Sequence, residues 1–168
     1  MRSTAVLVAG FWLGLLVASW VMATANFRTA ERVAGADLRP EMAEKLAGVP
    51  PEGRRMVLRH LAAEINRWMF RQGSYVQLGL GLGLLALAWS QGRAARVLVG
   101  VALVLTALQL FGLAGQIASV GRGIDFLPRP LPPDLARRFG VLHGVYVLVD
   151  LVKAMALAAA AVVLIRRP

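Results

Sequence analysis

Cysteine is absent from the 168-residue sequence. Without it the chain cannot form disulfides, thiol nucleophiles, iron–sulfur clusters or zinc sites with cysteine ligands. The sequence also lacks a His-Glu-x-x-His metal motif, an activated nucleophile and an acidic dyad. We therefore expect a protein that is not an enzyme, with no catalytic residues and no bound metal.

Charged residues are scarce as well, at 17% of the chain, and they are unevenly spread. Four stretches contain almost none, and each approaches or exceeds the ~20 residues that span a hydrocarbon core of ~30 Å. A soluble fold of this length could not bury four such segments. The sequence predicts a single all-α integral membrane domain, a four-helix bundle with transmembrane helices at 4–26, 73–90, 96–120 and 138–165.

The first of these segments has a second interpretation. Met1-Arg2-Ser3, the apolar run after it and Ala23-Thr24-Ala25 resemble a secretory signal peptide with its cleavage site. We interpret the segment instead as a first transmembrane helix that the protein retains.

A polar stretch, residues 37–72, separates the first two spans and contains two predicted helices. The first begins at 37–41 and should stop at Gly48. The second begins at Pro51, and its helical period predicts an amphipathic, interfacial segment with a basic polar face. It could run straight into the second span, but we favour a change of direction near Gly73. Its interfacial candidates are His60, Glu64, Arg67, Trp68 and Arg71.

The remaining connections are marked by glycine and proline. Residues 90–93 predict a tight turn, and 121–123 predict a glycine-terminated end to the third span. Residues 121–137 form a Pro-rich loop, which should be stiff. Asp134 is the predicted N-cap of the last helix.

The net charge of +10 is best explained by arginines that flank the spans and meet lipid headgroups. No aromatic-interleaved basic patch is present, so we do not expect nucleic acid as a partner. Counting Lys and Arg favours a cytoplasmic location for the long first loop and the Pro-rich loop. The basic residues at the C-terminus, on the opposite side, favour the reverse orientation.

Polar residues interrupt the last two spans at helical spacing. The fourth carries one polar face, made of His143, Tyr146, Asp150 and Lys153. The third carries another, made of Thr106, Gln109 and Gln116. Counting along antiparallel helices places Gln109 at the depth of Asp150 and Gln116 at the depth of His143. We predict that the two faces pack together in these layers.

These residues allow three interpretations. Polar side chains often hold membrane helices together by hydrogen bonds, and an Asp–Lys pair can be electrically neutral. Ionisable groups within a span also mark proton, ion or small-molecule pathways. The third interpretation, ligation of haem or contact with a pigment, is opposed by geometry, because a continuous second helix would place His60 ~20 Å outside the bilayer. We expect no cofactor.

Small residues recur at helical spacing on the first three spans and permit close helix approach. Packing within the chain and oligomerisation explain them equally well. They are Gly10, Gly14 and Ala18, then Gly79 and Gly83, then Gly112 and Gly115.

The segment Arg138-Phe139-Gly140-Val141-Leu142-His143-Gly144 resembles the last-helix motif of the bacterial relatives of transmembrane protein 205, small four-helix membrane proteins of uncharacterised function. The first helix, with Phe11-Trp12-Leu13-Gly14, is similar too. The chain departs from that family's pattern at Tyr146 and Asp150. The resemblance implies an architecture and no mechanism.

Together these patterns favour a non-catalytic protein of the bacterial inner (cytoplasmic) membrane, whose partners are the lipid bilayer and other membrane proteins. It would serve as an accessory or structural subunit of a larger complex. The alternative is a small transporter or a proton- or ion-handling protein that uses the polar faces of helices three and four.

Overall fold

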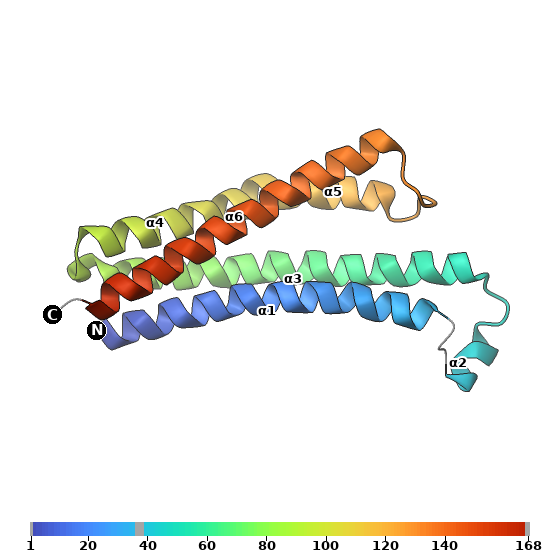
Figure 1. The fold of residues 1–168 in the computed structure, drawn as a ribbon, viewed down its shortest axis with the longest axis horizontal. Coiled ribbons are helices and arrows are strands. Elements are labelled where there is room, and N and C mark those ends of the chain that lie inside the picture. Colours follow the sequence, from blue (N-terminus) through green and yellow to red (C-terminus); the bar gives the residue numbers. More distant parts are fainter. Residues whose placement is uncertain (1, 36–38, 167–168) are drawn as a thin grey trace.

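The computed structural model describes residues 2–35 and 39–166, and within them all regular structure is helical. Figure 1 shows the elements in chain order. They are α1 (Arg2–Ala34), α2 (Pro40–Lys45), α3 (Pro51–Ala88), the 3-10 helix η1 (Trp89–Gln91), α4 (Arg93–Ala107), the π-helix η2 (Leu108–Leu113), α5 (Ala114–Ile124) and α6 (Pro133–Arg166).

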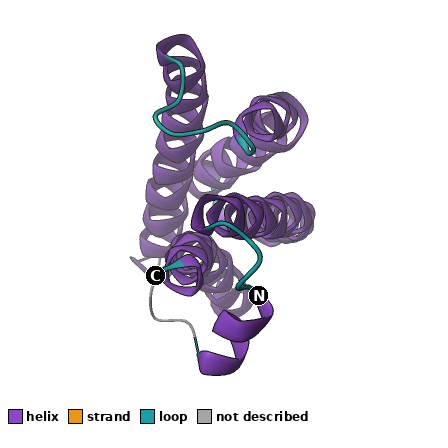
Figure 2. Cartoon of the chain, turned by 90° about the vertical axis from the view of Figure 1, so that its right-hand side faces the viewer, coloured by secondary structure: helices purple, strands orange, loops and turns teal. Residues whose placement is uncertain are grey.

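Four helices are long and apolar enough to cross a membrane: Arg2–Ala34, Pro51–Gln91, Arg93–Ile124 and Pro133–Arg166. This finding confirms the all-α prediction and the number of candidate spans. α1 packs against α3 and α6, and α4 packs against the same two helices, so the four close into a ring. The view along the bundle in Figure 2 shows the helices grouped around a common axis.

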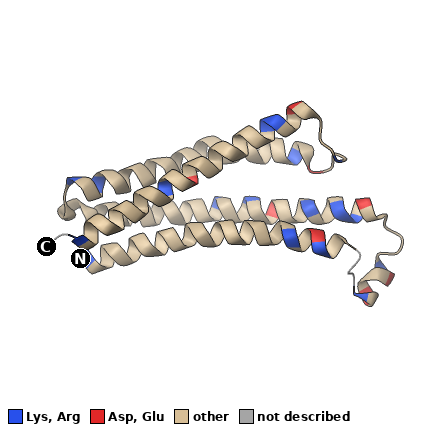
Figure 3. Cartoon of the chain, in the orientation of Figure 1, with Lys and Arg blue, Asp and Glu red and all other residues tan. Residues whose placement is uncertain are grey.

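Both chain ends and the α3–α4 turn lie at one end of the bundle, whereas α2 and the Pro-rich loop lie at the other (Figure 1). We call the latter the loop end. Charged residues gather at the two ends, most densely at the loop end, and leave the middle almost free of them (Figure 3). This distribution follows from the cost of removing charge from water, since a charged group is buried only when it is paired.

An apolar core holds the four helices together at the end that carries the chain termini. Trp12 of α1 lies fully buried against Gly81 of α3, where a Cβ would come within 2.8 Å of the indole ring. Arg2 closes this end by donating hydrogen bonds to the carbonyl oxygens of Leu164 and Ile165. The core residues include Ala5, Ala9, Trp12, Leu16, Leu84, Ala88, Val99, Leu157, Ala160 and Leu164.

The turn between α3 and α4 is formed as predicted. Gly92 adopts a φ of 98°, which only glycine reaches without strain, and the new helix begins at Arg93.

The predicted change of direction near Gly73 is wrong. α3 continues from Pro51 to Ala88 and is straight in Figure 1. A glycine costs a helix only about 1 kcal/mol relative to alanine. Here α1 packs along α3 on both sides of that glycine, through the Asn26–Asn66 and Trp12–Gln77 hydrogen bonds. Tertiary packing therefore outweighs the local signal.

Two helix ends also differ from the prediction. α5 runs through Gly121 to Ile124, and Gly121 is needed for space, because a Cβ there would lie 2.8 Å from Nη2 of Arg67. α6 begins at Pro133, so Asp134 lies inside its first turn. Of the first predicted loop helix, only Pro40–Lys45 is observed, and residues 36–38 lie outside the described part.

Candidate functional site

Side chains from three helices form the polar core cluster: the buried Gln109, Asp150 and Lys153, and the half-buried Trp20. Gln109 Nε2 donates to Asp150 Oδ1 at 2.9 Å, and Lys153 Nζ donates to Gln109 Oε1 at 2.5 Å. Lys153 Nζ also lies 2.8 Å from Asp150 Oδ1. Trp20 Nε1 donates to Asp150 Oδ2 at 3.1 Å. The predicted Gln109–Asp150 layer is confirmed.

The polar core cluster is closed to its surroundings. Gln109 is 0% exposed, Lys153 1% and Asp150 4%. Both carboxylate oxygens of Asp150 accept hydrogen bonds, and Gln109 uses both ends of its amide. Its amide nitrogen also donates to the Tyr146 carbonyl oxygen at 3.1 Å. The charges of Asp150 and Lys153 cancel, so the arrangement satisfies itself without a further ligand.

Trp20 is the member of the cluster that sequence reasoning missed. Its only sequence signal is an indole N–H, which needs an acceptor when it is buried. Trp12, eight residues earlier on α1, finds its acceptor at Gln77 Oε1, 3.2 Å away. The pattern of the sequence does not reveal that α1 packs beside α6, so the partner of Trp20 could not be assigned.

The predicted His143–Gln116 layer is wrong, and the π-helix η2 explains why. A π turn contains an extra residue, so every later side chain is rotated relative to a continuous α-helix. Gln116, which follows η2, is exposed and donates to the carbonyl oxygen of Gly112 at 2.9 Å. His143 is also exposed and stacks on Phe139, with ring centroids 5.9 Å apart. Only residues at or before the start of η2 keep the predicted face.

The other two predicted members of the polar faces are buried but play lesser parts. Thr106 donates to the carbonyl oxygen of Ala102, one turn earlier in its own helix, at 2.9 Å. The ring of Tyr146 packs edge-on against Phe70, with centroids 5.8 Å apart. Thr106 is therefore a buried residue that bonds within its own helix, and it is not a hydrogen-bond partner of Lys153.

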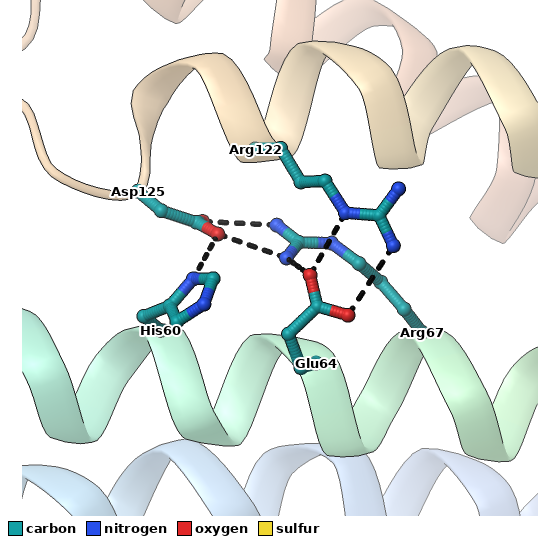
Figure 4. Close-up of polar contacts among 5 residues, drawn as sticks. All are labelled: His60, Glu64, Arg67, Arg122 and Asp125. Atoms are coloured by element: carbon teal, nitrogen blue, oxygen red, sulfur yellow. Dashed lines mark hydrogen bonds and ion pairs between the residues drawn. The ribbon is translucent and has the colours of Figure 1, made fainter.

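A second group of polar residues, the ion-pair cluster, links α3 to the end of α5 (Figure 4). It consists of His60, Glu64, Arg67, Arg122 and Asp125. Arg67 is at its centre: it donates to both oxygens of Asp125, at 2.8 and 2.9 Å, and to Glu64 at 2.7 Å. Arg122 donates to Glu64 from the other side, and His60 Nδ1 lies 2.8 Å from Asp125 Oδ2.

Hydrogen bonds favour the charged forms of Glu64 and Arg67 in this cluster. The bonds from Arg122 and then Arg67 lower the pKa of Glu64 from 4.5 to about 2. Burial alone would lower the pKa of Arg67, but its hydrogen bonds to Asp125 and Glu64 raise it. All these groups lie outside the predicted spans. The ion pair of Glu64 on α3 with Arg122 on α5 therefore links the two helices at neutral pH.

Three members of the ion-pair cluster offer ligand atoms of the kind that bind metals. One atom from each of His60, Glu64 and Asp125 lies within 4.8 Å of the others. Both carboxylates, however, already accept hydrogen bonds from Arg67 and Arg122. Two guanidinium groups at these distances would repel a metal cation, so this residue set fits an ion-pair network better than a metal centre.

The first half of α3 presents one face to the rest of the chain and another to its surroundings, and its interfacial location stays a prediction. Its polar residues point toward α1 and α5, while a stripe of apolar side chains is exposed. Trp68 is 66% exposed and Arg71 is exposed. The two histidines have separate partners, Asp125 for His60 and Phe139 for His143. The exposed stripe contains Val57, Leu61, Ile65 and Trp68.

Glycines divide into two kinds by what surrounds them. Gly81 is buried, and a Cβ there would lie 2.6 Å from Leu103 Cδ1. By contrast, a Cβ at any of the glycines in the three predicted small-residue stripes would meet nothing within 4 Å. These stripes, the outward glycine faces, are exposed and play no part in packing within the chain. They contain Gly10 and Gly14, Gly79 and Gly83, and Gly112 and Gly115.

No family model matches the chain, and no curated protein or solved structure matches it either. The resemblance of residues 138–144 to the relatives of transmembrane protein 205 therefore stays an expectation.

Proposed function

We propose that this chain is a non-catalytic integral membrane protein that packs as an accessory subunit against a larger membrane assembly. The observation that carries the proposal is a contrast between the interior of the chain, where polar groups are paired, and the glycines on its surface, which contact nothing in the chain. The interior polar groups satisfy one another, whereas the outward glycine faces are exposed and unused.

The polar core cluster supports a structural role for the interior. Charged groups within a membrane are costly unless they are paired. Asp150 and Lys153 are paired with each other and with Gln109, and the indole of Trp20 completes the shell. None of these side chains lines either of two cavities found at the loop end. The cluster thus fixes how α1, η2 and α6 meet.

The outward glycine faces support a helical partner. In lipid, apolar surface alone does not drive helices together, and small residues contribute by letting two backbones approach closely. Gly10 and Gly14 lie on α1, and Gly79 and Gly83 lie on α3, the helix that α1 packs against. Each of these two neighbouring helices therefore offers a partner helix a surface of small residues.

Extraction from native membranes with a mild detergent tests the partnership. The tagged wild-type chain should co-purify with a defined set of membrane proteins at a fixed ratio. The variants Gly10→Leu/Gly14→Leu and Gly79→Leu/Gly83→Leu should fold normally, because nothing in the chain occupies that space, and at least one should lose the companions. Ala159→Leu, an exposed position on α6, is the matched control. Retention of all companions by both glycine variants would refute the proposed surface.

The location is part of the proposal. We place the four helices across the inner membrane of a bacterium, with the loop end in the cytoplasm. The charge distribution supports the crossing, and the Lys and Arg count favours this orientation.

One observation favours a second candidate function, the handling of protons or ions. Asp150 and Lys153 are ionisable groups buried within an apolar helix, and such groups often form transport pathways. The purified chain in vesicles that contain a pH-sensitive dye tests this alternative. A proton flux that is present in the wild type and lost in Asp150→Asn would favour it over the packing role.

A further inference from the structure

A small cavity of about 130 Å³ lies at the loop end, between α1, α3, α5 and the Pro-rich loop. Part of its wall is apolar, with Phe27, Leu127 and Phe139. Another part is cationic, and includes Arg59 and Arg129. The carboxylates of Glu52 and Asp125 also line it. A cavity with apolar side chains and arginines in excess of carboxylates suits an anion that is attached to an apolar group.

Among the described residues, three of the four arginines that line the cavity pair with a carboxylate, and Arg129 does not. Arg59 pairs with Glu31 at 2.7 Å, and Arg55 pairs with Glu31 and Glu52. Arg67 is bound to Asp125. Over residues 2–35 and 39–166, no carboxylate oxygen lies within 4.0 Å of the Arg129 guanidinium.

The surroundings of Arg129 are unfavourable to its charge in the absence of an anion. Arg129 is exposed overall. Burial of part of its side chain, and then the like charge of Arg59, lower its pKa, and the carboxylates of Asp125 and Glu31 offset this only in part. An anion placed between these two arginines would relieve both effects, since it would replace lost hydration and screen their repulsion.

Size narrows the class of ligand. A cavity needs only ~10–15 Å³ of this kind of volume to hold one water. About 130 Å³ therefore has room for a group several times larger than water, such as a phosphate. Drug-sized molecules need pockets of ~300–1,000 Å³. A nucleotide or a peptide would therefore not fit inside.

The position of the cavity indicates where such a phosphate would come from. Phe27 directly follows the predicted span 4–26, and Phe139 stands at the start of the span 138–165. The cavity is thus at the level where two apolar segments end, which in a membrane is the level of the lipid headgroups.

We propose that this cavity binds the phosphate group of an anionic phospholipid, with Arg129 and Arg59 as its ligands and the phenylalanines beside its acyl chains. The inference rests on the proposed membrane location and is independent of the accessory-subunit role. A soluble phosphate ion has the same recognition chemistry, so the test includes both sources.

Native mass spectrometry of the chain released from nanodiscs provides the lipid measurement. The nanodiscs contain phosphatidylcholine with a minor fraction of phosphatidic acid or phosphatidylglycerol. The wild type should retain one anionic lipid in preference to phosphatidylcholine. Arg129→Gln should weaken this retention about fivefold, the factor that corresponds to ~1 kcal/mol per arginine near an anionic lipid. Arg137→Gln is the matched control, because Arg137 is exposed at the same end but outside the cavity.

A parallel series measures thermal unfolding in detergent with inorganic phosphate against chloride at equal ionic strength. Retention of anionic lipid that depends on Arg129 supports the proposal. Stabilisation by phosphate that depends on Arg129, without lipid retention, supports the phosphate site and assigns it to a soluble ion. Equal effects of Arg129→Gln and Arg137→Gln in both series, or no binding in either, overturn it. Failure of the chain to enter nanodiscs would instead contradict the membrane location.

Discussion

The Asp150 carboxylate has three partners: it accepts hydrogen bonds from Gln109, Lys153 and Trp20. Two of these could be predicted from the sequence. Lys153 follows at a spacing of three on the same helix, and Gln109 lies at the same depth on an antiparallel neighbour. The third could not, because it depends on which face of α6 is next to α1.

Removing one charge of the Asp150–Lys153 pair should lower the free energy of unfolding more than removing both charges. Asp150→Ala leaves Lys153 buried without its counter-charge, which typically costs about 3–5 kcal/mol. The double variant Asp150→Asn/Lys153→Met has no unpaired charge and should recover most of that loss. Unfolding of the purified chain in mixed micelles, followed by circular dichroism, measures both. Equal destabilisation by the single and double variants would show that charge pairing is not what matters at this position.

The ion pairs of Glu64 should stabilise the protein in a defined pH range. Its pKa is about 2 in the folded chain and 4.5 without its partners. The stabilisation is therefore complete above about pH 4.5 and is lost as the pH falls through about 2. Its size should not exceed ~1 kcal/mol, because the side chain is 36% exposed and solvent screens the charges.

Thermal unfolding between pH 6 and pH 2 tests this range. The wild type should lose more stability on acidification than Glu64→Gln, which has no charge to lose at this position. Parallel pH profiles for the two proteins would contradict the role of Glu64 in linking α3 to α5.

At the scale of the helix, the sequence pattern predicted the positions of the long apolar helices well. It predicted less well which side chains face which way and where each helix ends. The length of the apolar stretches was enough to locate all four helices. A helix needs at least ~20 apolar residues to span a hydrocarbon core, so each such stretch is long enough to recognise. The π turn at Leu108–Leu113 left no recognisable signal, and it moved Gln116 off the predicted face. Two glycines gave a signal that the structure does not follow. Gly73 and Gly121 commonly end or bend helices, yet α3 continues through Gly73 and α5 through Gly121.

Two glycines only two residues apart on α3, Gly81 and Gly83, lie on nearly opposite faces of the helix and should respond oppositely to alanine. Gly81→Ala places a Cβ within 3.0 Å of Trp12 and Leu103, and overpacking of this kind costs about 1–3 kcal/mol. Gly83→Ala meets no neighbour and should gain up to ~1 kcal/mol from better helix propensity.

Unfolding in mixed micelles compares the two variants directly. If Gly81→Ala were as stable as Gly83→Ala, the close packing of Trp12 against α3 would be wrong.

For the molecule as a whole, composition was sufficient to predict a four-helix chain with charged ends. It could not indicate which side of each helix faces inward. The apolar residues Val57, Leu61 and Ile65 turned out to face outward, and the glycine stripes did too. Both outcomes depend on long-range contacts, such as Arg67 with Asp125, that no local period encodes.

The outward glycine faces are the central element of the proposed function, and cross-linking inside the membrane tests them most directly. Because the chain has no cysteine, Gly14→Cys or Gly83→Cys introduces a unique thiol. A short thiol-reactive photo-cross-linker is then attached in native membranes, with Leu148→Cys, exposed on α6, as the control. A packing role predicts a discrete adduct with a different membrane protein from at least one glycine position and none from the control. No adduct from either glycine position, or adducts only of twice the chain's own mass, would contradict it.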